Sequence, residues 1–301
     1  MSRQRGRLLA ALCLLVLAPV CAEYISAYDD STGHPMALLA ALAIFVPLYG
    51  APALLIREAA RRFGIRWPGI LALATGFGIL QAGVIDQSMF NDSYRDIGYW
   101  HDMIAPTWIE PLGLSVNASL AFVAGHVIWS FCVPIALTEA VGPKPARPWL
   151  RLPGLLATVA LYLAAAALIL TTTLQDEADH ASPAQFAGSL ALAGLLAVFA
   201  FTLGRRHRPR RERWAPAPVL VGIVSLVVSL AFNFQASSVT ATVVLIGLLV
   251  GTAVVVTRLS GSSSWNSRHV AALATGALLG RVVMGFFAQP LGEVSAAAQL
   301  G

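Results

Sequence analysis

The chain consists largely of long apolar stretches, each about as long as the hydrocarbon core of a bilayer is thick. A helix rises about 1.5 Å per residue, so about 20 apolar residues cross the roughly 30 Å of hydrocarbon. Nine such stretches lie at about residues 8–28, 36–56, 68–90, 117–140, 153–173, 184–203, 216–236, 238–257 and 269–289. We therefore predict an all-α fold, a polytopic transmembrane helix bundle that forms a single transmembrane domain over residues 1–301.

Composition excludes the other classes of chain. Hydrophobic residues make up 57% of the sequence and charged residues 12%, with a mean hydropathy of +0.72. Soluble proteins carry about 25% charged residues, so the apolar excess here must face lipid. The same numbers exclude a disordered or collagen-like chain. The three cysteines, Cys13, Cys21 and Cys132, lie inside apolar stretches and have the spacing of neither a disulfide framework nor a metal site.

The ends of the apolar stretches alternate in charge. All of the 20 basic residues except Arg95 and Arg281 lie at one set of ends. The other ends carry acidic residues, namely Asp29, Asp30, Asp92, Asp96, Asp102, Glu110, Asp176, Glu177, Asp179 and Glu293. Because cytoplasmic loops are rich in Lys and Arg, this pattern predicts a cytoplasmic N-terminus and an external C-terminus. Arginine at every basic position but Lys144 is typical of a high-GC bacterial genome, so we expect a bacterial plasma membrane.

The first stretch has a second interpretation. Basic residues Arg3, Arg5 and Arg7 precede an apolar run, and Val20-Cys21-Ala22 resembles a signal-peptide cleavage site. The segment is thus either an uncleaved first helix or a signal peptide. The orientation of the remaining stretches is the same in both cases.

Polar residues inside the apolar stretches are the candidate functional residues, because a charge costs about 2.5–3.5 kcal/mol or more at mid-membrane. By their distance from the stretch ends, these residues gather in the outer half of the membrane. They form one predicted cluster: His126, Asp86, Arg281, Glu23, Gln81 and Asn233. We expect Asp86 and Arg281 to interact, with Glu23 as the competing partner of the arginine. Prolines inside the stretches (Pro19, Pro47, Pro52 and Pro134) indicate kinks near a cavity.

Each of these residues also has a purely structural interpretation. His126 is either a proton-carrying group or metal ligand, or a neutral histidine hydrogen-bonded to a neighbouring helix. The structural interpretation of Glu23 is an outer cap of the first span. Glu58 and Arg62 have the spacing of an interfacial helix pair. The connection of about 91–116, rich in tyrosine and tryptophan, is expected along the outer headgroup region.

Signatures of soluble enzymes are absent from the sequence: GxGxxG, GxxxxGK[ST], HExxH and GxSxG do not occur. The segment Phe122-Val-Ala-Gly-His126 matches FxxxH and resembles the second motif of the CAAX-type intramembrane proteases. The paired-glutamate EExxxR motif of that family is missing, and Gln81-Ala-Gly-Val-Ile-Asp86 is the nearest segment, so no catalytic role is carried over.

A broader resemblance covers about a third of the chain. Tyr49-Gly50, Arg57-Glu58, Ser88-Met-Phe-Asn91 and His126-Val-Ile-Trp129-Ser130 are similar to uncharacterised multi-pass membrane proteins of actinobacteria. This resemblance implies residence in a bacterial plasma membrane and no particular activity.

The polar cluster favours a transporter- or permease-like protein with an outward-facing polar cavity for a small solute or ion. The alternatives are an intramembrane hydrolase or lipid-directed enzyme that uses His126 with a carboxylate, and a structural partner subunit of a membrane complex. The expected partners are therefore the lipid bilayer, a small solute or ion, and other membrane proteins. The sequence predicts no binding of nucleic acid, because the basic run 205–211 lacks aromatic residues to stack on bases. It predicts no cofactor and no metal.

Overall fold

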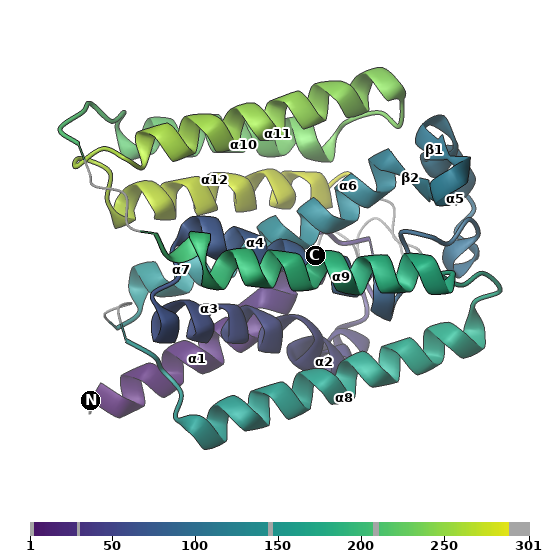
Figure 1. Cartoon of the computed structure of the whole chain (residues 1–301), viewed down its shortest axis with the longest axis horizontal. Helices are drawn as coiled ribbons and strands as arrows, with labels where there is room; N and C mark the ends of the chain where they lie inside the picture. The colour runs from purple at the N-terminus through teal and green to yellow at the C-terminus, as the bar shows by residue number, and fades with distance from the viewer. Residues whose placement is uncertain (1–2, 29–30, 144–146, 207–210, 289–301) are drawn as a thin grey trace.

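Long helices that run along a common direction dominate the computed structural model (Figure 1). The structure describes residues 3–28, 31–143, 147–206 and 211–288. The predicted charges on residues 29, 30, 144, 208, 210 and 293 therefore lie outside the described residues. The only strands of the described part are β1 (Trp108–Ile109) and β2 (Leu114–Ser115), which pair antiparallel. The fold is all-α, as predicted.

Seven helical stretches of the described chain are long and apolar enough to cross a membrane. They are Gln4–Tyr24, Pro35–Phe63, Trp67–Ile85, Val116–Val141, Leu152–Asp176, Pro183–Arg205 and Val239–Leu259. The other two predicted crossings correspond to α10 (Pro218–Asn233) and α12 (Ser267–Gly285). The first is only 16 residues long, and the second contains Arg268 and Arg281, which lower its hydropathy. The count of nine crossings therefore remains a prediction.

Several crossings are divided into shorter helices. The first consists of α1 (Arg3–Pro19) and a π-helical segment. The second contains α2 (Pro35–Phe45) and α3 (Ala51–Phe63), the third α4 (Trp67–Leu80), and the fourth α6 (Val116–Gly125) and α7 (Val133–Val141). In contrast, α8 (Leu152–Asp176), α9 (Pro183–Phe201) and α11 (Val239–Leu259) are uninterrupted.

The interruptions are four π-helical segments, one in each of the first four crossings. They are Val20–Tyr24, Val46–Gly50, Gln81–Ile85 and His126–Cys132, and we call them the π-segments. Proline has no amide hydrogen to donate and clashes with the preceding turn. Pro19 and Pro134 flank the first and fourth segments, and Pro47 lies within the second. The predicted proline distortions thus take the form of π-helix, a rare conformation that is frequent at functional sites.

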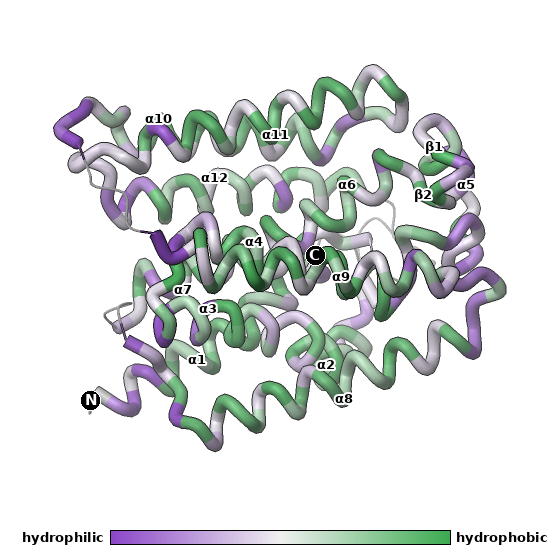
Figure 2. Tube along the Cα trace, viewed as in Figure 1, coloured by the Kyte–Doolittle hydropathy of each residue, from purple (hydrophilic) through white to green (hydrophobic). Residues whose placement is uncertain are grey.

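The helices divide into a central and a peripheral set. The most apolar window of the third crossing is 72% buried, whereas those of α8, α9 and α11 are 17%, 11% and 11% buried. The peripheral helices therefore expose leucine and valine to the bilayer, and they are coloured as hydrophobic along most of their length (Figure 2). Small residues join α10 to α12: a Cβ atom added at Gly276 would lie 2.1 Å from the Gly222 carbonyl oxygen.

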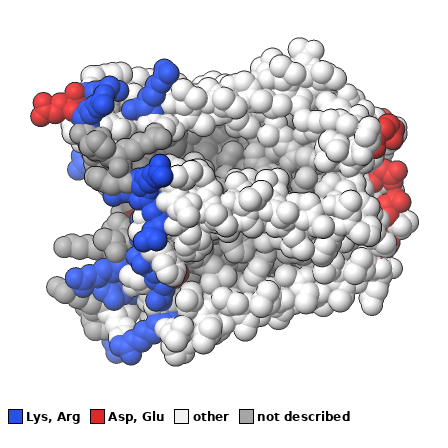
Figure 3. Space-filling model, in the orientation of Figure 1, with Lys and Arg blue, Asp and Glu red and all other residues white. Residues whose placement is uncertain are grey.

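Charged side chains lie at the two ends of the bundle. Lys and Arg cover one end of the face shown in Figure 3, and Asp and Glu gather at the opposite end. This separation agrees with the alternation seen in the sequence. Which end faces the cytoplasm is still predicted from the positive-inside rule.

The connection before α6, which is predicted to lie along the outer headgroup region, forms a folded segment. It contains α5 (Trp100–Ile104) and the β1–β2 hairpin. Trp100 is only 3% exposed, donates a hydrogen bond to the Asn91 carbonyl oxygen and stacks on Phe122. The Trp100 ring is therefore packed against α6, while Tyr99 remains exposed.

Candidate functional site

The π-segments bring part of the predicted polar cluster together. Glu23 belongs to the first segment, Tyr49 to the second, Gln81 to the third and His126 to the fourth. The fourth segment packs against both the first and the second. A π-helical turn inserts one extra residue, so it changes the direction of the side chains that follow. The distorted parts of the first, second and fourth crossings therefore meet in one region of the bundle, whereas the third π-segment packs against α6, α8 and α9.

Glu23 is a buried carboxylate. Its side chain is 8% exposed and accepts a hydrogen bond of 2.9 Å from the Tyr28 hydroxyl. The Tyr49 side chain also lies near Glu23. The carboxylate is thus buried near the end of the first crossing, and both its functional role and its role as an outer cap stay predictions.

His126 lies beside Tyr49, and the two rings stack with centroids 5.8 Å apart. Its Nδ1 is 3.2 Å from the Ser130 hydroxyl, one turn further along the same crossing. The imidazole is half-buried. Neither Asp86 nor Glu23 is hydrogen-bonded to this ring among the described contacts, and its hydrogen bond stays within its own crossing.

Arg281 of α12 reaches the same region from the other side. Its Nη1 donates a 3.1 Å hydrogen bond to the Asn233 side-chain oxygen, and its guanidinium lies 4.8 Å from the centre of the Trp129 ring. Its Nε is buried and has no hydrogen-bond partner within the described chain. Trp129 belongs to the same π-segment as His126, so Arg281 packs against the fourth crossing.

The expected contact between Asp86 and Arg281 does not occur within the described residues. Asp86 accepts hydrogen bonds from the Gln81 amide at 3.2 Å and from the Ser88 hydroxyl at 2.7 Å. These neighbours lie in its own segment and satisfy the carboxylate locally. Depth in the membrane did not reveal which helices are adjacent, and Asn233 of α10 occupies the position next to the arginine.

A second buried polar cluster lies at the basic end of the bundle. Arg57 and Glu58 of α3 are both 0% exposed, and their Nη1 and Oε1 atoms are 2.7 Å apart. Arg57 also binds Glu139 of α7 through Nε at 3.1 Å, and its guanidinium lies 3.5 Å from the centre of the Trp149 ring.

Glu58 links this cluster to the connection before α8. It accepts hydrogen bonds from the backbone amides of Trp149 at 2.7 Å and Leu150 at 3.2 Å. Arg61 closes the cluster from the other side by binding Glu139 through Nε at 2.7 Å. We call Arg57, Glu58, Arg61, Glu139 and Trp149 the inner ion cluster.

Sequence reasoning missed most of the inner ion cluster. It noted Glu58 and Arg62, which are indeed in contact at 3.2 Å, but as an ordinary interfacial pair. Glu58 is instead fully buried. The available signal was Glu139, an acidic residue near the basic end of its crossing, where it needs a cationic partner.

The connections at the acidic end of the bundle are held together by carboxylates. The Asn91 side-chain amide donates to Glu177 at 2.8 Å, and the Ser93 hydroxyl donates to Asp179 at 2.9 Å. A hydrogen bond with Asp179 raises the pKa of Asp92 above its ordinary value, because two adjacent carboxyl groups resist being charged together. The hydrogen bonds of Asp179 with Asp92 and Ser93 lower its own pKa.

Residues 12–287 match the model of a family described as an uncharacterized membrane protein family. The chain belongs to this family. No curated protein sequence and no solved structure matches the chain. The part matched by the family model contains the four π-segments, the inner ion cluster and Arg281. The chain is thus an integral membrane protein with several apolar helices.

Within the part of this family member that the structure describes, no group of three His, Cys, Asp or Glu side chains is arranged to hold a metal ion. Five residues with hydrogen-bonding or charged side chains lie in or around the fourth π-segment. They are Glu23, Tyr49, His126, Arg281 and Asn233, which we call the outer polar cluster.

Proposed function

We propose that this protein is a transporter- or permease-like membrane protein that binds a small polar or charged solute at the outer polar cluster. The observation that carries the proposal is the presence of a π-segment in each of the first four crossings, three of which meet at His126. Secondary transporters commonly form their sites from interrupted helices near the bilayer midplane.

The chemistry of the outer polar cluster supports the binding of a solute. Glu23 offers a carboxylate and Arg281 a guanidinium with an unpartnered Nε. A charged side chain inside the membrane costs more free energy than an apolar side chain at the same position. The presence of both groups therefore needs an explanation beyond stability. A solute with hydrogen-bonding or charged groups fits this pair, in which Tyr28 holds the carboxylate and Asn233 holds the guanidinium.

The inner ion cluster supports an outward-facing arrangement. It joins α3, α7 and the connection before α8 by ion pairs whose principal members, Arg57 and Glu58, are fully buried. Such contacts close the basic end of the bundle. Because ion pairs can exchange partners, a transport cycle that opens this end would break them and expose the outer polar cluster to the other side.

Accessibility of one engineered thiol tests the proposal. In a variant with Cys13, Cys21 and Cys132 replaced by alanine, Ser130→Cys places a thiol beside His126. We expect an impermeant thiol reagent to modify it both in intact cells and in inside-out vesicles, since alternating access exposes the site to each side in turn. Leu195→Cys, on the lipid-facing side of α9, is the matched control and should stay unmodified. Modification of Ser130→Cys from one side alone, or from neither, would contradict the proposal.

The Ser130–His126 contact favours one alternative, an intramembrane hydrolase. A histidine within about 3.2 Å of a serine hydroxyl can act as its general base. However, no described carboxylate is hydrogen-bonded to the imidazole to orient it as a general base. A fluorophosphonate probe should therefore leave Ser130 unmodified in the purified protein. Covalent labelling that is lost in Ser130→Ala would favour the hydrolase instead.

A further inference from the structure

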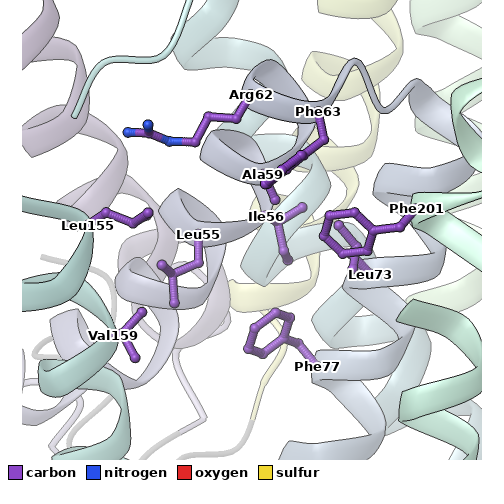
Figure 4. A pocket seen from close by; sticks show the side chains of 10 residues that line it. All are labelled: Leu55, Ile56, Ala59, Arg62, Phe63, Leu73, Phe77, Leu155, Val159 and Phe201. Atoms are coloured by element: carbon purple, nitrogen blue, oxygen red, sulfur yellow. The ribbon is translucent and has the colours of Figure 1, made fainter. Parts of the chain in front are cut away.

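An apolar groove opens on the lipid-facing surface near the basic end of the bundle. It has a volume of about 250 Å³ and lies between α3, α4, α8 and α9 (Figure 4). Leu55 of α3 and Val159 of α8 face each other across it, and Phe77 of α4 lies at its far end. Helices α8 and α9 are among the least buried of the bundle. The groove therefore faces the bilayer.

Arg62 is the one polar residue that lines the groove, and it lies at the end opposite Phe77 (Figure 4). Its Nη2 donates to the Leu150 carbonyl oxygen and, at 3.2 Å, to Glu58. These bonds hold the guanidinium at the rim of the groove. Its Nη1 makes no hydrogen bond to any described group, and the side chain is 26% exposed. One face of this cation is thus available to a ligand.

The surroundings of Arg62 are positively charged. Arg66, Arg205 and Arg206 are exposed at the same end, where the Arg66 amide donates a 3.0 Å hydrogen bond to the Gly204 carbonyl oxygen. Of the two carboxylates of the neighbourhood, Glu139 pairs with Arg57 and Arg61, and Glu58 is shared between Arg57 and Arg62, so arginines outnumber carboxylates at this end. An anionic group is therefore favoured beside Arg62.

We propose that this groove binds an anionic phospholipid of the adjacent leaflet. One acyl chain fills the groove, and the phosphodiester accepts a hydrogen bond from Nη1 of Arg62. Acyl chains are the apolar chains that the bilayer supplies, and Arg62 lies at the basic end of the bundle, where we expect the headgroup. Arginine suits this role because its planar guanidinium can hold protein and phosphate oxygens at once.

The two parts of the groove contribute differently to binding. An acyl chain gains little by leaving other lipid tails for an apolar groove, because both surroundings are hydrocarbon. The groove therefore contributes shape and van der Waals contact. The charge-assisted hydrogen bond to the phosphate distinguishes a bound lipid from the bulk.

Native mass spectrometry of the purified protein with added phosphatidylglycerol tests the proposal. Val159→Trp fills the groove without touching Arg62, and Leu156→Trp, three residues away on the exposed face of α8, is its matched control. We expect Val159→Trp to lose the bound lipid and Leu156→Trp to retain it. Arg62→Gln should retain phosphatidylglycerol about tenfold more weakly, as expected for the loss of one hydrogen bond to a charged group. Arg258→Gln, at the exposed end of α11, should bind like the wild type.

Three results would overturn the proposal. The first is equal phosphatidylglycerol retention by Val159→Trp and Leu156→Trp. The second is retention of phosphatidylcholine as strong as that of phosphatidylglycerol, which would assign the groove to acyl chains of any lipid. The third is a dimer in the wild type that Val159→Trp dissociates while bound lipid is unchanged, which would assign the groove to a second copy of the chain.

Discussion

At the scale of single residues, the two buried clusters differ in how their charges are compensated. In the inner ion cluster, Arg57 has two carboxylates and the Trp149 ring around it. In the outer polar cluster, Arg281 has the neutral Asn233 oxygen and the Trp129 ring. Desolvation of an ion costs roughly several kcal/mol, and a neutral partner offsets less of this cost than an oppositely charged partner does. The outer cluster is therefore the less satisfied of the two.

A double-mutant cycle will show which residue stabilises Arg281. We expect the losses in unfolding temperature from Asn233→Ala and Arg281→Gln, measured in detergent, to be non-additive, because the two side chains share a 3.1 Å hydrogen bond. Asp86→Asn combined with Arg281→Gln should be additive, since Asp86 bonds Gln81 and Ser88 instead. Coupling between Asp86 and Arg281, with none between Asn233 and Arg281, would show that the described geometry is wrong.

At the scale of helices, the apolar stretches predicted where the chain crosses the membrane, because length and hydropathy are local properties. The π-segments were only indicated by prolines such as Pro19 and Pro134. The segment Gln81–Ile85 contains no proline and gave no such signal. Which helices are adjacent is a property of tertiary packing, and so the partners of Arg281 and Glu58 could not be read from the sequence.

The contact between α10 and α12 gives a prediction at this scale. A Cβ atom at Gly276 would approach the Gly222 carbonyl oxygen to 2.1 Å, whereas nothing lies within 4 Å of one at Gly251 of α11. Gly276→Ala should lower the free energy of unfolding by about 1–3 kcal/mol, the usual cost of overpacking. Gly251→Ala should cause no loss. Detergent unfolding curves of the two variants check this, and equal behaviour would mean that α10 and α12 are not in close contact.

At the scale of the whole molecule, the separation of charge between the two ends defines the axis along which the bundle crosses the membrane. It does not define which end faces the cytoplasm. The cytoplasmic placement of the basic end is a prediction that single cysteines can check. In the background without native cysteines, Ala184→Cys at the start of α9 should react with an impermeant thiol reagent in intact cells. Ser263→Cys, exposed at the basic end, should react only after permeabilisation. Reaction of Ser263→Cys in intact cells would reverse the orientation.

The π-segments make the outer polar cluster sensitive to chain length in a way that composition does not show. Each π-helical turn holds one residue more than the α-helix it replaces, and one residue corresponds to about 100° of rotation in an α-helix. Deleting Val127 would convert His126–Cys132 toward ordinary α-helix. The side chains before the deletion would then rotate about the helix axis by roughly that angle relative to the side chains after it. The hydropathy of the crossing would barely change, yet His126 would no longer face Tyr49 while Pro134 and Glu139 kept their positions. A one-residue deletion at each segment would thus leave a chain that still inserts in the membrane but whose polar groups point in separate directions.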